Sequence, residues 1–208
     1  MYTPKTFLVT EQSVLFDFIE EIQFGKLITS RKGKIDISSI PFFLDREKGE
    51  LLGHLAKENS QWQTLMLADD LVVLFEGPHG YVSPAWYSQP DGVPTWNYVN
   101  VEVAGKAETI KTEADSLLVL QKLTEASESR YGEGWSIFDL NESVMKTMLK
   151  QIIFFRIKIK SIEGKAKLSQ NRSKMDRVGV IQKLSTSEDT QLQALSQWMR
   201  NTLKDENS

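Results

Sequence analysis

The sequence contains no cysteine and only two histidines, and both shortages exclude kinds of chemistry. Without cysteine the chain has no disulfides, no thiolate nucleophile and no cysteine-ligated metal. His54 and His79 lack a second histidine or a carboxylate at ligand spacing, so we expect no metal site. No Gly-x-Ser-x-Gly elbow, Walker loop or Gly-x-Gly-x-x-Gly fingerprint occurs either. The sequence therefore gives no indication of a catalytic triad for hydrolysis or of a glycine-rich loop that binds a nucleotide.

Long apolar runs are also missing. No stretch approaches the roughly 20 residues that span a bilayer, so we expect no membrane association. The N-terminus, Met-Tyr-Thr-Pro-Lys-Thr-Phe, lacks the apolar core of a signal peptide, which makes the cytoplasm the expected location. The 208 residues, of which 40% are hydrophobic and 25% charged, are typical of one globular domain with a sizeable core.

Acidic residues slightly outnumber basic ones, 28 to 25, but the basic residues are concentrated in one tract. The net charge of −3 argues against a protein coated with nucleic acid. Residues 156–183 nevertheless hold nine Lys or Arg against two acidic residues, a local charge of +7. Alternating basic residues at 156, 158 and 160 indicate the solvated face of a strand. Residues 167–172 offer donors for a phosphate or for DNA, although no helix-turn-helix signature accompanies them.

Residues 76–98 hold four of the six prolines and five aromatic residues. Closely spaced prolines forbid a long helix and remove donors from a sheet ladder. Because disordered segments are poor in aromatics, the stretch predicts an ordered loop with short strands at its ends. Its Trp and Tyr side chains suit either the wall of a flat-ring site or a dimer interface, where both residue types are enriched.

The apolar periodicity predicts a mainly β fold with peripheral helices. Because the helices do not alternate regularly with strands, we expect a closed or sandwiched antiparallel core. A boundary near 163–170 divides the expected domain, 1–165, from a basic segment and C-terminal helix, 166–208, packed on the barrel or on a partner subunit. The expected strands are 26–30, 35–44, 50–56, 71–75, 98–104, 106–111 and 152–162, and the expected helices are 11–23, 57–68, 113–126, 142–150 and 187–204.

Residues 54–59, His-Leu-Ala-Lys-Glu-Asn, run from the end of a strand into an expected helix. Backbone N–H groups at a helix start, with Lys57 and Asn59 beside them, would suit a phosphate. The alternative is an ordinary helix start with a solvated lysine.

Several of these motifs together resemble one family. They are the opening Met-Tyr-Thr-Pro-Lys-Thr-Phe, Gly-His-Leu-Ala-Lys-Glu-Asn (53–59), Gly-Pro-His-Gly-Tyr-Val-Ser-Pro-Ala-Trp-Tyr (77–87), Val-Pro-Thr-Trp-Asn-Tyr (93–98) and Lys-Leu-Ser-Gln-Asn-Arg (167–172). In order and in register, they resemble the PaiB-type FMN-binding negative transcriptional regulators of the flavin split-barrel superfamily. The resemblance implies a six-stranded antiparallel split β-barrel and a homodimer that binds FMN between its subunits.

The same resemblance assigns candidate cofactor-binding residues. His54, Lys57 and Asn59 would lie near the phosphate or ribityl chain. Thr29, Ser30, Ser39 and Ile40 lie on strands that line the ring in this superfamily. Trp96 and Asn97 would reach the flavin of the other subunit, and Lys167, Gln170 and Asn171 would contact the phosphate side.

The sequence is compatible with three functions. The first is an FMN-binding dimeric regulatory protein, with DNA or a regulatory protein as a further partner. The second is an FMN-dependent oxidoreductase, either flavin reductase-like or acting on haem or another aromatic substrate, because flavin itself supplies the redox chemistry. The third is a cofactor-free interaction protein whose flavin site has decayed.

Overall fold

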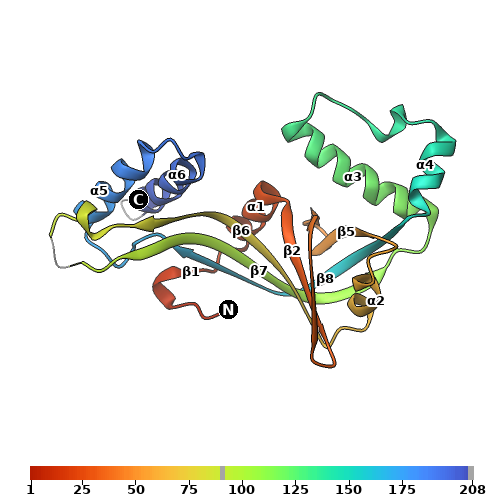
Figure 1. Cartoon of the computed structure of the whole chain (residues 1–208), viewed down its shortest axis with the longest axis horizontal. Coiled ribbons are helices and arrows are strands. Elements are labelled where there is room, and N and C mark those ends of the chain that lie inside the picture. Colours follow the sequence, from red (N-terminus) through yellow and green to blue (C-terminus); the bar gives the residue numbers. More distant parts are fainter. Residues whose placement is uncertain (90–91, 206–208) are drawn as a thin grey trace. The chain divides into compact units, whose positions relative to one another are not determined.

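The computed structural model describes residues 1–89 and 92–205 (Figure 1). Pro90 and Asp91, which belong to the aromatic-rich stretch, lie outside the described residues. The chain forms two compact units. The terminal unit comprises 1–11, 76–101 and 163–208, and the central unit comprises 12–75 and 102–162. Each is described by itself below.

An eight-stranded sheet is the main element of the fold, in the order β3-β2-β6-β7-β8-β5-β4, with β1 paired to β8. The expected mainly β architecture with peripheral helices is confirmed, but six strands is wrong. β1 has two residues and β4 three, too few for an alternating pattern to be recognised. The strands are β1 Leu8–Val9, β2 Phe24–Arg31, β3 Lys34–Pro41, β4 Phe43–Asp45, β5 Glu50–Ala56, β6 Asp70–Val82, β7 Thr95–Thr109 and β8 Ile152–Lys167.

Antiparallel ladders organise the central unit. β2 and β3 form a hairpin whose two turn residues, Lys32 and Gly33, both have positive φ, as the tight hairpin turn requires. β2 also pairs with β6, and β5 pairs with both β4 and β8. β3 approaches β5. No ladder among the described residues joins these two strands, so the sheet is an open split barrel and not a closed one.

Aromatic and aliphatic side chains fill the core of the central unit. The Phe42 ring meets Phe75 and Phe155 edge-on, with ring centroids 5.7 and 6.4 Å apart. α1 (Gln12–Ile22) is the first expected helix, and it buries Phe18 and Ile19. A second buried cluster gathers Leu52 and Phe154 with Val119 and Leu123 of α3 (Glu113–Tyr131).

The helices of the central unit follow the expected positions with one large difference. α2 runs only over Gln61–Met66, six residues, where the periodicity predicts a helix from residue 57. α4 (Glu142–Leu149) lies where the sequence predicts a helix over 142–150.

The short 3-10 helices are Lys5–Phe7, Pro84–Trp86 and Ile137–Asp139. None of the helices in the described part of the chain has the length and apolar character that crossing a membrane requires.

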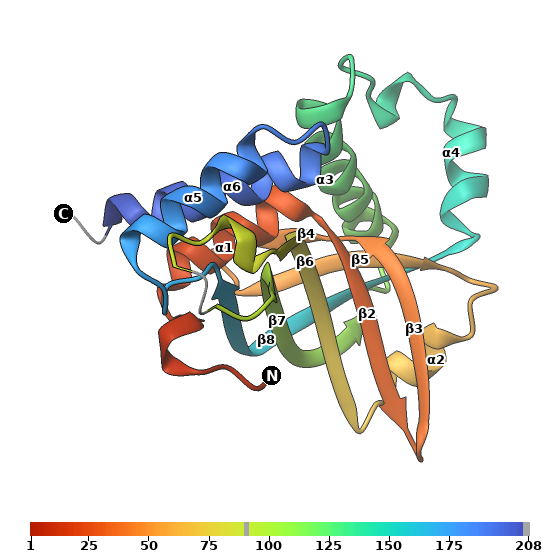
Figure 2. The same ribbon diagram turned by 60° about the vertical axis from the view of Figure 1, so that its left-hand side comes forward.

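Two antiparallel helices, α5 (Lys174–Ser185) and α6 (Thr190–Asp205), pack side by side in the terminal unit (Figure 1 and Figure 2). α6 is expected from the sequence, but α5 is not, because the tract reads as basic and polar. Ser173 begins α5 by accepting a hydrogen bond from Asp176 N–H, and Arg177 is buried with 2% of its surface exposed. The division into 1–165 and 166–208 stays a prediction.

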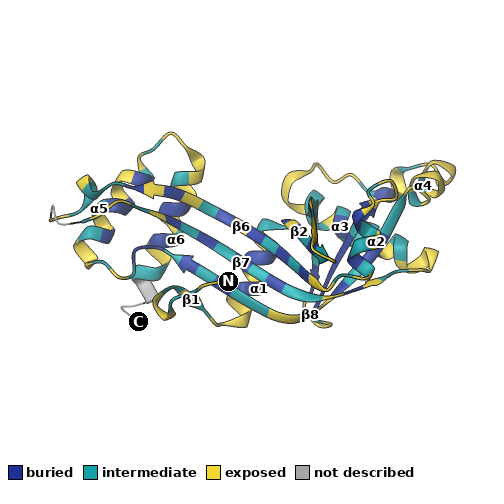
Figure 3. Ribbon diagram, turned by 60° about the horizontal axis from the view of Figure 1, so that its bottom comes forward, coloured by how far each residue is buried: buried dark blue, intermediate teal, exposed yellow. Residues whose placement is uncertain are grey.

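The aromatic-rich stretch is more regular than expected. β6 continues to Val82 and β7 begins at Thr95, so the connecting segment is only 83–94. Buried positions alternate with more exposed ones along both strands (Figure 3). The pairing of β2 with β6 ends at Leu74. Pro78 therefore lies where β6 is no longer paired with β2, and a proline is tolerated beside a free strand edge.

Candidate functional site

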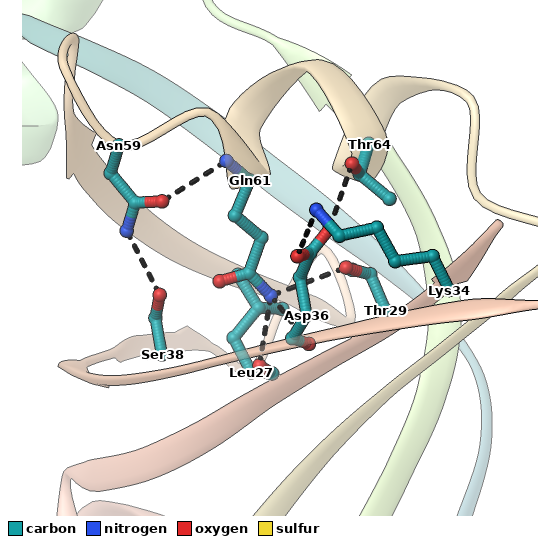
Figure 4. Close-up of polar contacts among 8 residues, drawn as sticks. All are labelled: Leu27, Thr29, Lys34, Asp36, Ser38, Asn59, Gln61 and Thr64. Carbon is teal, nitrogen blue, oxygen red and sulfur yellow. Dashed lines mark hydrogen bonds and ion pairs between the residues drawn. The ribbon is translucent and has the colours of Figure 1, made fainter.

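A polar network joins α2 to the β2–β3 hairpin in the central unit (Figure 4). The buried Gln61 amide donates from Nε2 to Leu27 O at 3.0 Å, Asp36 O at 3.0 Å and Thr29 Oγ1 at 3.2 Å. Its Oε1 is buried and has no hydrogen-bond partner among the described residues. One glutamine thus anchors α2 to two strands and leaves an unsatisfied acceptor there.

Asn59 fixes the turn that leads into α2. Its Oδ1 accepts from Gln61 N–H at 3.0 Å and its Nδ2 donates to Ser38 Oγ at 2.9 Å (Figure 4). The Trp62 indole donates to Lys57 O at 3.1 Å. Residues 57–60 therefore form a turn, and the expected helix start beside Lys57 is wrong. Asn and Ser stabilise a local turn by side-chain-to-backbone bonds, which competes with helix formation there.

The outer rim of this network carries a charge pair. Lys34 Nζ lies 2.9 Å from Asp36 Oδ1, and Thr64 Oγ1 donates to Asp36 Oδ2 at 3.0 Å (Figure 4). Hydrogen bonds from Lys34 and then Thr64 lower the pKa of Asp36. The carboxylate stays ionised and holds α2 against β3.

The strand residues predicted to line a ring differ in their access to solvent. Thr29 is fully buried and its hydroxyl accepts from Gln61, whereas Ser30 and Ile40 are half-buried and Ser39 is exposed. Ile40 pairs with Gly25, and Ser39 pairs with Lys26 across the hairpin. Ser30, Ser39 and Ile40 therefore remain accessible to a ligand. Thr29 is not accessible, and its hydroxyl helps to hold the Gln61 side chain in place.

His54 lies on β5, partly buried against the ring of Phe154 at a centroid distance of 5.7 Å. Its Nδ1 is buried and has no hydrogen-bond partner among residues 1–89 and 92–205. Burial lowers the pKa of His54, so the imidazole is neutral near pH 7. A neutral ring with an unsatisfied nitrogen is able to donate or accept one hydrogen bond from a ligand.

Lys57 follows β5 directly and its side chain is exposed. Its backbone N–H donates to Gln151 O at 2.7 Å, which continues the pairing of β5 with β8. Its Nζ has no ionic or hydrogen-bond partner in the described part of the chain, and it lines a cavity of about 760 Å³ within the central unit. Lys57 thus carries a positive charge that no described residue compensates, on a backbone held by this hydrogen bond.

The remaining predicted residues belong to the terminal unit. Asn97 is fully buried, donates to Ser169 Oγ at 2.9 Å and contacts Met199 Sδ at 3.5 Å. Lys167 donates to the Thr95 hydroxyl. The Gln170 side chain accepts from Leu168 N–H at 2.7 Å and donates to Ala166 O at 2.6 Å. Asn171 is exposed. Asn97 and Gln170 therefore stabilise the terminal unit internally, and their predicted cofactor contacts stay predictions.

Trp96 has 54% of its surface exposed and forms part of an aromatic strip on β6 and β7. Its ring lies 6.3 Å from the His79 ring and 6.1 Å from the Tyr81 ring. Lys165 Nζ lies 5.2 Å from the Tyr98 ring centroid, within reach of a cation–π interaction. His79, Trp96, Tyr98 and Lys165 line a cavity of about 480 Å³ in the terminal unit, which therefore has a largely aromatic wall.

The sequence matches, over residues 1–161, the protein family described as "Putative FMN-binding domain". The chain belongs to this family. This chain is also 33% identical over 209 residues to "Protease synthase and sporulation protein PAI 2" of Bacillus subtilis. The alignment covers 98% of this chain and 99% of that protein. An uncharacterised protein of Emericella nidulans is 31% identical over 87% of this chain and 89% of its own length.

Solved structures show the same fold at low sequence identity. The flavocytochrome Anf3 of Azotobacter vinelandii matches with a TM-score of 0.64 and 14% identity, covering 83% of this chain and 75% of that one. An FAD and haem binding protein of Mycobacterium smegmatis matches with a TM-score of 0.61 and 17% identity, over 82% and 78% of the two chains. This chain therefore has the flavin split-barrel fold.

The residues present fit FMN, the cofactor of the family. A phosphate dianion needs a cation, and Lys57 provides one without a protein partner. The polar edge of a flavin needs hydrogen bonds, and the buried His54 Nδ1 and Gln61 Oε1 lack them among the described residues. Unsatisfied buried polar atoms are uncommon in native proteins unless a ligand or water completes them. No group of three His, Asp or Glu side chains in the described residues could hold a metal ion.

The sequence analysis missed Gln61 and a set of lysines around Lys57. Gln61 stands two residues after Asn59, an Asx-turn signal that indicates where the chain begins α2. The lysines at 111, 146 and 150 are separated from Lys57 by more than fifty residues. The pairing of β5 with β8, together with the hydrogen bond from Ile110 N–H to Phe154 O, brings them to the same cavity, so no local motif indicates them.

Proposed function

We propose that this protein is an FMN-binding, dimeric regulatory protein of the PaiB type. The observation that carries the proposal is the 33% identity over 98% of the chain to a protein named for protease synthesis and sporulation. The unsatisfied polar atoms of His54 and Gln61 and the unpaired Lys57 support cofactor binding in the central unit. The regulatory role has its support in that relative's name alone.

In this proposal Lys57 holds the phosphate of FMN, and His54 and Gln61 each make a hydrogen bond to the bound cofactor. Ser30, Ser39 and Ile40 are accessible on β2 and β3 and would line the ring. Lys57→Ala should weaken FMN binding about 10- to 100-fold, because a hydrogen bond to a charged group contributes about 1.5–3 kcal/mol. Lys160→Ala, an exposed lysine on β8 outside the cavity, is the matched control. Equal affinities of the two variants would refute the phosphate role of Lys57.

The proposed dimer uses the aromatic strip of the terminal unit. Trp and Tyr are enriched at interfaces, and Trp96 is the most exposed tryptophan of the described chain. Trp96→Ala should weaken dimerisation or FMN binding, because a large aromatic loses its burial. Sedimentation at a series of protein concentrations, with and without FMN, measures both. An unaltered dimer affinity together with unaltered FMN binding would remove Trp96 from either role.

A second candidate is an FMN-dependent oxidoreductase. Two proteins with the same fold are named as a flavocytochrome and as an FAD and haem binding protein. Bound FMN would supply hydride and electron transfer. NAD(P)H-dependent bleaching followed by turnover of an electron acceptor would favour the enzyme. Salt-sensitive binding to a specific promoter fragment, without turnover, would favour the regulator.

A further inference from the structure

A lysine-lined cavity in the central unit extends well beyond the residues considered above. It lies where three segments meet: the end of β5, the β7–α3 junction and the α4–β8 junction. Four lysines (Lys57, Lys111, Lys146 and Lys150) and one glutamate (Glu113) line it, which gives a net charge of +3. Its volume of about 760 Å³ is that of a small-molecule site.

Three of the four lysines lack a side-chain partner among the residues that the structure describes. Lys146 is paired with Glu142 one helical turn away, at 2.5 Å. Lys57, Lys111 and Lys150 are exposed, and none has a hydrogen bond or ion pair through its side chain to any described residue. Ammonium groups that line one cavity repel one another, and a bound anion reduces that repulsion.

Backbone hydrogen bonds hold these lysines close to the same end of β8, on the two edges that face β5 and β7. Lys57 N–H donates to Gln151 O at 2.7 Å, next to Lys150. Ile110 N–H, next to Lys111, donates to Phe154 O at 2.9 Å. Lys57 therefore makes one of these backbone hydrogen bonds itself, and Lys111 and Lys150 each stand next to a residue that does.

The cavity also has an apolar wall. Ile110, Leu149 and Phe154 line it and pack against the buried cluster that includes Val119 and Leu123. A purely inorganic anion would gain nothing from such a wall. An anionic ligand with an apolar or aromatic body would bury its body there while its charge meets the lysines.

We propose that this cavity binds a phosphorylated ligand with an aromatic body, a nucleotide, through Lys57, Lys111 and Lys150. A phosphate monoester carries a charge of about −1.5 to −2, which the cavity charge compensates. The phosphate can belong to FMN or to a second nucleotide. The inference shares Lys57 with the proposed function but does not depend on flavin binding.

The test is isothermal titration of the full chain with FMN and, separately, with ADP. The double variant Lys111→Gln, Lys150→Gln removes two lining charges, and Lys160→Gln is the control with an exposed lysine on β8 that does not line the cavity. We expect the double variant to bind at least one of the two probes tenfold or more weakly, and the control to bind both within twofold of the unaltered chain. Because the substituted lysines are exposed, unchanged thermal melts will show that both variants fold.

The outcomes separate the sources of the phosphate. Loss of FMN affinity in the double variant identifies the flavin phosphate as the ligand group, and loss of ADP affinity alone identifies a second nucleotide. If FMN binds but the double variant binds both probes normally, the inference is overturned and the proposed function stands. If FMN does not bind but ADP binds in a lysine-dependent manner, the inference stands and flavin binding fails. If neither probe binds the unaltered chain, both are wrong.

Discussion

Replacing Gln61 by alanine removes the amide that joins α2 to the β2–β3 hairpin. The Nε2 group donates to three acceptors, Leu27 O, Asp36 O and Thr29 Oγ1, and the side chain is buried. A buried hydrogen bond contributes about 0.5–1.5 kcal/mol, and a buried acceptor left unpaired costs about 1–3 kcal/mol. One amide group provides two hydrogens for the three acceptors, so we expect a loss of about 3 kcal/mol from the free energy of unfolding.

Gln63→Ala in the same helix is the matched control. Gln63 is exposed, and the change in helix propensity is the same at both positions. We expect this control to stay within about 0.5 kcal/mol of the unaltered chain. For a chain of this size a loss of about 3 kcal/mol lowers the melting temperature by roughly 6–12 °C.

Urea denaturation followed by circular dichroism measures the difference between the two variants. The midpoint for Gln61→Ala should fall while the slope of the transition stays the same. Equal midpoints for the two variants would mean that the Gln61 hydrogen bonds contribute nothing, and would refute the account of how α2 is anchored.

Three further outcomes follow from the geometry. Gly105→Ala should destabilise the chain by about 1–3 kcal/mol, because the added Cβ would lie 2.4 Å from Lys158 O. Gly25→Ala should cost less, since its Cβ would meet only side chains, at 3.0 Å, and equal costs in urea melts would contradict this. Burial lowers the pKa of His54 in the folded state, so stability should fall as pH decreases from about 6.5, where the unfolded chain first takes up the proton, through the folded pKa. His54→Asn should reduce that pH dependence, and an unchanged pH profile would show that His54 is not the group responsible.

Local apolar periodicity in the sequence predicted most of the fold. The apolar face of residues 12–22 and the alternation in β3 and β8 are local signals. The helix and β8 begin close to where expected, whereas the strand expected over 35–44 divides at Phe42 into β3 and β4. Two-residue β1 and three-residue β4 are defined only by their pairing partners, so no pattern within them could indicate strands. The sequence did not predict α5, because the buried Arg177 places a charged residue on the face of the helix that packs inward.

The candidate site was predictable only in part. Lys57 and His54 belong to one contiguous motif. Among the described residues, the exposed Lys57 ammonium has no charged partner and the buried His54 Nδ1 has no hydrogen-bond partner. The side-chain amide of Asn97, in contrast, donates a hydrogen bond to Ser169, which lies 72 positions away in the sequence. Whether a polar side chain faces a ligand or a distant part of its own chain depends on such tertiary contacts, and sequence spacing does not contain them.

The measurement that tests the central claim most directly is a titration of the purified chain with FMN, followed by flavin fluorescence and absorbance. The account predicts saturable binding with about one FMN per chain, weakened by Lys57→Ala and not by Lys160→Ala. A chain that is folded, remains colourless after purification from flavin-rich medium and does not quench FMN fluorescence at any concentration would contradict it.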